Sequence, residues 1–586
     1  MKLQVLADVF EKVEGTTKRL EMTDLLVNLM KQTPSRVIDK VAYLTIGEIY
    51  PPYVGVELGV AEKLAVRAIA AVTGLPEKNI AVKLKKTGDL GLTVQDLLDK
   101  KTQQTLGKQP LTVERTYQTL EKIAHATGSG SQETKIKLLV GLLNDATPRE
   151  AKYILRIVLG RLRLGVADMT LLDALAIAYG GGKESRETIE RAYNLTSDIG
   201  YVAKTLAKKG MKEIEKFAVT FGKPIKPQMA ERLASLDEIL EKLGGEAAAD
   251  YKYDGLRIQA QVSPNSINLF SRRQENITDQ FPDIVKGLRE SIKAKEAIVD
   301  GEAVPIDPNT GDFLPFQVIS QRRGRRHEID RMVEEVPVAL CLFDALYIDD
   351  EDLTLKPYPE RRKRLEKIVR KTETIRLSET IISNKPQKIE AFFNKAVHEG
   401  TEGLILKSVG PESIYEAGKR GWLWIKWKRS YRSEMADTVD LVVVGAFSGR
   451  GRRAGTYGAL LMAAYNPDSD RFDTVCKLGS GFTDEDLARL PELFKSLLLT
   501  HPHPRVNALM KPDFWFIPSK VLEVLGDEIT LSPLHTCGFG SIRPESGLAI
   551  RFPRLVKFRD DRAAEDATTV KEILEMYNTQ LKKIEA

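Results

Sequence analysis

The chain has 586 residues, of which 42% are hydrophobic and 29% charged, and its formal net charge is +6. This length exceeds what one hydrophobic core can organise, since domains hold about 150 to 200 residues, so three or four folded units are expected. No apolar run approaches the roughly 18 residues that a membrane-spanning helix requires, and this excludes an integral membrane protein of the helical type.

Cysteine and histidine are too scattered to build the common metal or disulfide sites. Cys341, Cys476 and Cys537 are odd in number and far apart, so neither a disulfide framework nor a CxxC zinc site is expected. The six histidines are equally dispersed. A catalytic metal would therefore be held by carboxylates and phosphates. Because Met1-Lys2-Leu3 leads into an amphipathic helix rather than a signal sequence, we expect an intracellular, cytoplasmic protein.

Residues 1–222 are predicted to form an α-helical domain. Ile136, Leu139 and Leu143 follow the i, i+3, i+7 spacing of a helix face. Residues 147–150, Thr-Pro-Arg-Glu, have the form of a capping box with proline at the first helical position. Residues 1–225 carry 34 basic and 26 acidic side chains. This basic excess fits a polyanionic partner such as duplex DNA, although a solvated surface is an alternative.

A change of pattern after residue 222 predicts a second domain, at 223–429, and a third at 430–586. Gly222-Lys223-Pro224-Ile225-Lys226-Pro227 has two prolines and no apolar periodicity, which indicates an extended connector. Short β-branched runs then predict an antiparallel-rich α+β domain with strands at 258–262, 267–270, 297–299, 338–348 and 404–406. Five further short strands, at 439–444, 459–465, 475–478, 521–524 and 549–552, fit a small barrel of the OB type, followed by a helix at 570–577.

The segment Tyr251-Lys252-Tyr253-Asp254-Gly255-Leu256-Arg257 sets a lysine beside an acid, a tight glycine and an arginine. A nucleophilic lysine must lose its proton although its ordinary pKa is about 10.4, which desolvation and neighbouring cations favour. The pattern Lys-x-Asp-Gly is weak by itself. A strand followed by a turn, with Lys252 solvated, is the alternative interpretation.

Five more charged clusters follow in order along the chain: Ser271-Arg272-Arg273, Val299-Asp300-Gly301-Glu302, Leu342-Phe343-Asp344, Thr401-Glu402-Gly403-Leu404-Ile405-Leu406-Lys407 and Trp424-Ile425-Lys426-Trp427-Lys428. In this order and spacing they resemble the motifs of the ATP-dependent DNA ligases, most closely the archaeal type. These enzymes belong to a superfamily of covalent nucleotidyltransferases that includes RNA ligases and mRNA capping enzymes.

The resemblance implies an enzyme that seals nicks in duplex DNA during replication, repair and recombination, with a link to cell division. Lys252 would attack the α-phosphate of ATP and become lysyl-AMP. AMP would then pass to the 5′-phosphate of the nick, and the 3′-hydroxyl would displace it. The domains implied are a helical DNA-binding domain, an adenylation domain and an OB-fold domain, and the cofactors implied are ATP and Mg²⁺.

The resemblance also assigns roles to individual side chains. Glu302 and Glu402, expected at strand ends, would support the metal. The nucleotide would be bound by Asp250, Arg257, Arg272, Glu302, Phe343, Arg420, Lys426, Lys428, Arg551 and Arg554. Asp250 stands where the family more often has glutamate, and the last two arginines would orient pyrophosphate, which requires the barrel to move about a hinge near 428–430. Trp422, Trp424 and Trp427 are interpreted as packing residues.

Two segments of the helical domain resemble phosphate-contacting loops of the same family. Gly128, Ser129, Gly130 and Ser131 precede a predicted helix, whose N-terminus offers free N–H groups to a phosphate. Arg161 and Arg163 form the second segment. An ordinary loop with a helix cap is the alternative for the first.

Gln103-Gln104-Thr105-Leu106 stands where some relatives bind a sliding clamp, but it lacks paired aromatics, which favours a plain loop. We expect a nucleoid-associated monomer.

Two rival functions stay open at this point. An RNA ligase or capping-type nucleotidyltransferase shares the central motifs, and the large helical domain speaks against both. A non-catalytic DNA-binding scaffold would need no complete set of Lys252, Glu302, Glu402, Lys426 and Lys428.

Overall fold

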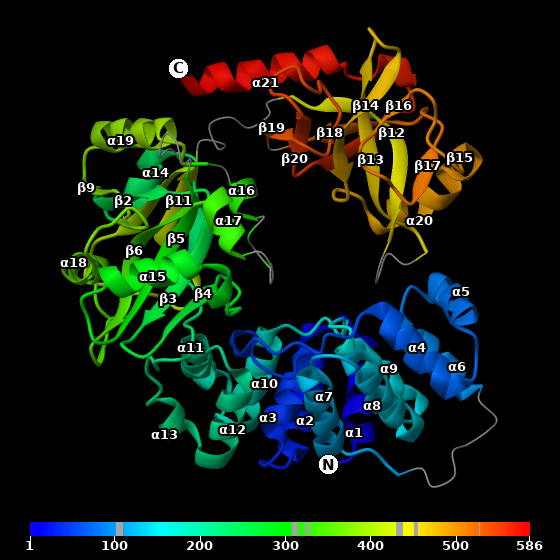
Figure 1. The fold of residues 1–586 in the computed structure, drawn as a ribbon, viewed down its shortest axis with the longest axis vertical. Coiled ribbons are helices and arrows are strands. Elements are labelled where there is room, and N and C mark those ends of the chain that lie inside the picture. The colour runs from blue at the N-terminus through cyan, green and yellow to red at the C-terminus, as the bar shows by residue number, and fades with distance from the viewer. Residues whose placement is uncertain are drawn as a thin grey trace. The chain divides into compact units, whose positions relative to one another are not determined.

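The computed structural model describes the chain except for residues 101–108, 307–312, 315, 321, 323, 325–328, 429–436, 450–454, 527 and 586. Its contacts divide it into two compact units, one of residues 1–80 and 90–428, the other of residues 81–89 and 429–586. Each unit is described by itself below (Figure 1). The predicted clamp segment Gln103-Leu106 lies outside the described residues.

Residues 1–222 contain helices and no assigned strand where the structure describes them, as predicted (Figure 1). The helices are α1 (Leu3–Glu14), α2 (Arg19–Gln32), α3 (Ile38–Ile46), α4 (Glu62–Thr73), α5 (Glu77–Thr87), α6 (Leu90–Asp99), α7 (Val113–His125), α8 (Ser131–Asp145), α9 (Pro148–Val158), α10 (Asp168–Tyr179), α11 (Arg186–Thr196), α12 (Ile199–Lys209) and α13 (Met211–Ile214). The capping box is confirmed at α9, where Thr147 Oγ1 accepts from the Glu150 N–H and the Glu150 carboxylate accepts from the Thr147 N–H.

Glu48, just after α3, gives this part of the chain a pH dependence. Burial and then the charge of Asp168 raise its pKa to about 7, with Lys226 acting in the opposite direction. The pKa of this carboxyl is about 4.3 in the unfolded chain, so the folded chain keeps its proton up to a higher pH. The stability contributed by this proton is fully present below about pH 4.3 and is lost as the pH rises through 7.

Glu48→Gln is expected to remove this loss, because the amide is neutral at every pH. The melting temperature of the variant should rise relative to the unmodified protein between pH 5 and pH 8. Thermal unfolding of both proteins across that range measures the difference. A difference that stays constant with pH would show that Glu48 does not titrate as described.

The connector after residue 222 is extended, as predicted, and two glutamines of the next domain hold it in place. Residues 223–228 lie outside helices and strands. The buried Gln259 side chain accepts from the Ile225 N–H at 2.8 Å and donates to the Ile225 carbonyl at 3.0 Å. The Gln261 side chain bonds Gly222 and Lys223 in the same way. A backbone segment with no strand partner is thereby satisfied, and the helical part is tied to the central part.

The central part, to residue 428, is built on two sheets. Its elements are β1 (Met229–Arg232), α14 (Leu236–Lys242), β2 (Ala247–Lys252), β3 (Leu256–Val262), β4 (Ile267–Ser271), α15 (Pro282–Ser291), β5 (Ala297–Pro305), α16 (Phe316–Ser320), α17 (Ile329–Glu335), β6 (Val338–Ile348), β7 (Glu351–Asp352), α18 (Tyr358–Ile368), β8 (Ile375–Leu377), β9 (Thr380–Ser383), α19 (Pro386–His398), β10 (Gly403–Ser408) and β11 (Arg420–Lys428).

The first sheet has the order β1-β11-β10-β2-β9, and the second has the order β4-β3-β5-β6-β7, with β8 paired to β6. Apolar side chains of α14 and α19 pack on the first sheet, and those of α15 and α18 pack on the second. All the strands predicted between residues 258 and 406 are present. The pairing in both sheets is mostly antiparallel, which confirms the expected fold class.

One position in this part was predicted wrongly. Glu302 lies inside β5 rather than at a strand end, because β5 continues to Pro305. Its neighbours Gly301 and Ala303 remain paired with β3 on one side and β6 on the other. Glu402 precedes β10 directly, as expected.

The second unit contains the barrel-like sheet. Its elements are β12 (Val439–Ser448), β13 (Tyr457–Asn466), β14 (Arg471–Leu478), α20 (Asp484–Leu493), β15 (Leu498–Leu499), β16 (Val506–Asn507), β17 (Phe514–Phe516), β18 (Val521–Leu525), β19 (Glu528–Ser532), β20 (Gly547–Arg551), β21 (Arg554–Phe558) and α21 (Val570–Glu585). The chain meanders through β12, β13 and β14, and β18 joins β12 to β21. This arrangement fits the predicted OB-like fold, and the terminal helix is longer than predicted.

Candidate active site

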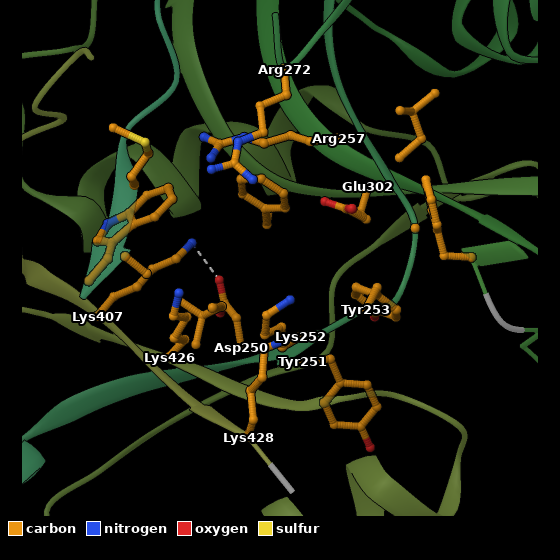
Figure 2. A pocket seen from close by; sticks show the side chains of 18 of the residues that line it. Asp250, Tyr251, Lys252, Tyr253, Arg257, Arg272, Glu302, Lys407, Lys426 and Lys428 are labelled. Carbon is orange, nitrogen blue, oxygen red and sulfur yellow. Dashed lines mark ion pairs between the residues drawn. The ribbon is translucent and has the colours of Figure 1, made fainter. Parts of the chain in front are cut away.

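Lys252 is the last residue of β2, a strand with a paired neighbour on each side. Successive side chains of a strand point to opposite faces, so Asp250 and Lys252 share one face and Tyr251 takes the other. Figure 2 shows this division, with the ring of Tyr251 extending away from the Lys252 ammonium. The Lys252 side chain is 22% exposed and ion-paired, so it is not the solvated turn lysine of the alternative interpretation.

The register of β2, β10 and β11 brings further motif residues to the same face. Gly403 of β10 pairs with Lys252 on one side and with Lys428 on the other. Two residues further along β10, Ile405 lies between Asp250 and Lys426. Residues directly opposite each other in a sheet point to the same face. Three segments far apart in the sequence are therefore joined in two rows.

Glu402 bridges the two lysines of the first row. Its Oε2 atom lies 2.5 Å from Lys252 Nζ and 2.7 Å from Lys428 Nζ. Burial by itself would raise the pKa of this carboxyl, but the charges of Lys252 and Lys428 outweigh it and hold the pKa below the ordinary value. Glu402 is thus an anion that fixes the position of both ammonium groups.

Two glycines allow the backbone to approach closely around Lys252. Gly403 has φ +137°, and a Cβ there would lie 2.3 Å from the Trp427 carbonyl. A Cβ on Gly255 would lie 2.4 Å from the Ala303 carbonyl. Both distances are far below van der Waals contact, so only glycine lets β10 reach β11, and the turn after Lys252 reach β5.

Cations surround the second row. Burial lowers the pKa of Lys426, and the charges of Arg420, Lys428, Lys252 and Arg272 lower it further. Figure 2 shows Arg257 and Arg272 on the side of the cavity opposite Lys426 and Lys428. A region of such concentrated positive charge suits a polyanionic ligand such as a triphosphate.

The second sheet supplies the facing wall. Arg257 of β3 and Glu302 of β5 are cross-strand neighbours. The Arg257 guanidinium donates to Asp300 Oδ2 at 2.8 Å and to the Gln228 carbonyl at 2.6 Å. Burial raises the pKa of Glu302 to about 7, against the opposing charges of Lys252 and Arg257. These contacts hold a cation and a titratable carboxyl in front of Lys252.

Asp250 is 2% exposed, and its carboxylate has three donors. Thr380 Oγ1 donates at 2.6 Å, the Tyr358 hydroxyl at 3.0 Å, and Lys407 Nζ lies 2.5 Å away. Lys407 Nζ is also 4.9 Å from the centre of the Phe343 ring and 4.4 Å from that of Trp424. The acid that was expected to bind the nucleotide is therefore held by two hydroxyl donors and one buried ammonium group.

Most of the motif side chains line one cavity of about 490 Å³. The predicted residues that line it are Asp250, Lys252, Arg257, Arg272, Glu302, Phe343, Arg420, Lys426 and Lys428. Glu402 is joined to it through Lys252 and Lys428. Arg551 and Arg554, both exposed, end β20 and begin β21 in the other unit.

The segments predicted to contact phosphates lie in the helical part. Gly128, Ser129 and Gly130 are exposed, and both glycines have φ near +81°, so the loop turns tightly before α8 begins at Ser131. Arg161 is exposed, and Arg163 has a positive φ of 60°. The loop satisfies part of the first turn of α8 itself, because the Ser131 N–H donates to the Gly128 carbonyl at 3.2 Å and the Thr134 N–H to the Gly130 carbonyl at 3.1 Å.

Sequence reasoning missed several residues of the cavity. Lys407 ends a motif that was recognised, but it was given no role, although it lies at the same face of β10 as Ile405. Trp424 was interpreted as packing; it is 5% exposed and also lines the cavity. Trp422 does not pack as predicted: it is 44% exposed, with Lys242 Nζ 4.6 Å from its ring centre. The two tryptophans are two residues apart and lie on the same face of β11, so alternation does not separate them; Trp422 lies nearer the start of the strand, where side chains are more exposed.

The carboxylates fit a divalent cation that shares its coordination with a ligand. Within the described residues, no three His, Cys, Asp or Glu side chains form a metal-binding group. Besides burial, the charge of Glu402 is one of the causes that raise the pKa of Glu302 in front of Lys252. One or two carboxylates with phosphate oxygens are the usual ligands of Mg²⁺. Glu302 and Glu402 could hold such an ion beside a bound triphosphate.

Comparisons with known proteins cover nearly the whole chain. The family described as ATP dependent DNA ligase domain matches residues 227–428, DNA ligase N terminus matches 2–176, and ATP dependent DNA ligase C terminal region matches 453–562. A DNA ligase of Staphylothermus marinus is 52% identical over 596 residues, with 100% of both chains covered. A probable DNA ligase of Aquifex aeolicus is 50% identical over 586 residues, with 99% of each chain covered.

A solved structure called Pmar-Lig_Pre. shares the fold, with a TM-score of 0.54 at 17% identity, over 95% of this chain and 99% of that chain. None of the helices in the described ranges has the length and apolar composition needed to cross a membrane.

Proposed function

Because the chain belongs to the family of ATP-dependent DNA ligases, we propose that its sealing of nicks in DNA begins at Lys252, which becomes lysyl-AMP. The observation that carries this assignment is the position of Lys252 Nζ. It lies where the rows of β2, β10 and β11 face Arg257 and Glu302 across one cavity. Among the described lysines, only Lys252 and Lys428 both line that cavity and form an ion pair with Glu402. Lys428 is proposed to bind phosphate.

The first step forms a P–N bond between Lys252 Nζ and the α-phosphorus of ATP. The bond from that phosphorus to the bridging oxygen breaks, pyrophosphate leaves, and Nζ gives up its proton. In the second step a 5′-phosphate oxygen at the nick attacks the same phosphorus, the P–N bond breaks, and Nζ takes up a proton again, which restores the lysine. The 3′-hydroxyl then attacks the 5′-phosphorus, and AMP leaves with the bridging oxygen. Phosphoryl transfers of this kind depend on positioning and on charge neutralisation.

The cavity residues divide these tasks. Glu402 orients the amine of Lys252 and the ammonium of Lys428 through its two short contacts. Lys426, Lys428, Arg272 and Arg420 neutralise the phosphates, and Phe343 offers a ring face to the nucleobase. Glu302 and Glu402 would hold Mg²⁺, which when bound withdraws charge from the α-phosphate. Arg551 and Arg554 are proposed to reach the pyrophosphate when the barrel domain swings; of the hinge expected at 428–430, residues 429 and 430 lie outside the described residues.

The domain limits 1–222, 223–429 and 430–586 belong to the proposal, as do the partners beyond DNA. The connector at 223–228 and the end of β11 at Lys428 support the two boundaries. A monomer associated with the nucleoid is the form proposed here. A sliding-clamp contact at Gln103-Leu106 remains a prediction.

We propose that the helical part of the chain contacts the nicked DNA through residues 128–131 and through Arg161 and Arg163. Arg161→Ala is expected to weaken nick binding similarly for all DNA sequences, because a phosphate contact carries no base information. It should also reduce the slope of log K against log salt by about 1. Titration of nicked duplex at several salt concentrations measures both.

Arg19→Ala is the matched control, since Arg19 is exposed but already paired with Asp173 at 2.9 Å. Its salt slope should stay unchanged. Equal slopes for Arg161→Ala and the unmodified protein would remove Arg161 from the interface.

The proposed function is tested by following the label from α-labelled ATP. The protein is incubated with Mg²⁺ and labelled ATP, freed of nucleotide, and then given nicked DNA or nicked RNA. Label is expected on the protein first and then on DNA, with sealed strand appearing. Transfer to RNA alone would favour an RNA ligase, and a protein that takes no label would favour the scaffold.

A further inference from the structure

A second cavity, of about 420 Å³, lies against the same stretch of chain as the first and has no role in the steps above. It is lined by Tyr251, Tyr253, Phe313, Cys341, Lys371, Thr372, Arg376, Leu377, Glu379 and Glu399. Tyr251 and Tyr253 flank Lys252, and Figure 2 shows Tyr251 extending from the strand away from the Lys252 ammonium. The volume lies in the range of small-molecule sites, about 300 to 1,000 Å³.

Aromatic rings form the floor of this second cavity. The ring centres of Tyr251 and Tyr253 are 5.9 Å apart, and those of Tyr253 and Phe313 are 5.3 Å apart in an edge-to-face arrangement. The two tyrosines are 3% and 5% exposed in the whole chain. Such a surface favours a flat, unsaturated body in the ligand.

Tyr251 also supplies a buried hydroxyl that lies near the carboxylate of Glu399. This hydroxyl has no hydrogen-bond partner in the described part of the chain. Burial and then the charge of Glu399 raise its pKa, so it remains a protonated donor at neutral pH. Leaving a buried donor without an acceptor is unfavourable, and an acceptor on a ligand would remove that cost.

The charged side chains of the cavity are of both signs. Arg376 is half-buried, with its Nε donating to the Glu373 carbonyl at 3.0 Å and its guanidinium 5.9 Å from the Phe313 ring centre. Within the described residues Arg376 makes no ion pair, so its charge is open to an anion. Lys371 adds a second cation, and the carboxylates of Glu379 and Glu399 can accept hydrogen bonds from an amine.

We propose that this second cavity binds an amino-substituted nucleoside monophosphate, with AMP as its ligand. Arg376 and Lys371 take the phosphate, the aromatic floor takes the base, and a carboxylate accepts from the exocyclic amine. The choice of AMP rests on the proposed function, because sealing releases AMP once in each cycle.

The test is a calorimetric titration of AMP into the fully adenylylated, full-length protein, in which covalent AMP already fills the first cavity. One AMP site is expected. Arg376→Gln should weaken it at least tenfold, and so should replacing AMP by inosine monophosphate, which lacks the amine, or by adenosine, which lacks the phosphate. Arg289→Gln, which changes an exposed arginine of α15 outside the cavity, should bind AMP as the unmodified protein does.

Labelling with α-labelled ATP precedes each titration, and it shows both that the variants fold and that adenylylation, the first step of the proposed function, takes place. Adenylylated protein that binds no AMP, or Arg376→Gln that binds it equally well, would overturn the second site and leave the ligase chemistry standing. A protein that takes no label contradicts the proposed function; it is then titrated directly, and the lack of an Arg376-dependent AMP site overturns this inference too.

Discussion

Lys252→Ala is expected to abolish transfer of label from α-labelled ATP to the protein, with a loss of roughly 10⁴-fold or more. The methyl group has no lone pair. Lys428 shares Glu402 Oε2 with Lys252, but it comes from β11, with Gly403 of β10 between the two backbones, so its amine approaches the cavity from another position. Nick binding should persist, because the proposed DNA contacts of the helical part lie outside this cavity. Gel detection of labelled protein and titration of nicked DNA measure the two effects.

Lys252→Arg tests whether labelling requires the amine as a nucleophile or only a positive charge at this position. A guanidinium can still pair with Glu402, but it stays protonated and cannot form a stable phosphoramidate. It should label no better than the alanine variant. Lys363→Ala, at an exposed position of α18, is the control and should label normally. If the Lys252→Ala protein were still labelled, the nucleophile would be another residue and the assignment of Lys252 would be wrong.

Much of the fold followed from local patterns. The apolar spacing of α8, the capping box of α9 and the β-branched runs from 258 to 478 each describe contacts that residues make within a few positions of themselves. The length of β5 did not follow. Gly301 and Glu302 lower strand propensity, yet pairing with β3 on one side and β6 on the other overrides it.

The sequence predicted the site residues that belong to short motifs. It did not predict the residues that strand pairing brings next to them. Lys252, Glu302 and Lys426 were found because they stand in short ordered clusters. The partners of Asp250 come from α18, β9 and β10, up to 157 positions away in the case of Lys407, so no local pattern announces them. The same holds for Gln259 and Gln261, whose amides satisfy the connector. Long-range pairing supplies both kinds of contact.

Asp344→Ala is expected to destabilise the central part by about 3 to 5 kcal/mol, the usual cost of leaving a buried charge without its partner. Asp344 and Arg361 are both 0% exposed, with Nε and Nη2 of the arginine 2.8 and 2.9 Å from the two carboxylate oxygens. The Arg361 Nη1 group donates only to carbonyls, of Lys356 and Ser413. Without Asp344 no anion balances the guanidinium. Chemical denaturation measures the loss.

Two further variants decide whether the unpaired charge is the cause. Glu366→Ala, which removes the half-exposed partner of Arg362, should cost only about 0 to 1 kcal/mol. Asp344→Leu combined with Arg361→Met should recover most of the stability, because an apolar pair of similar volume carries no desolvation penalty. If Asp344→Ala cost no more than Glu366→Ala, the pair would contribute nothing. Since Phe343 adjoins Asp344 in β6, the loss of stability should be accompanied by weaker ATP binding in the first cavity.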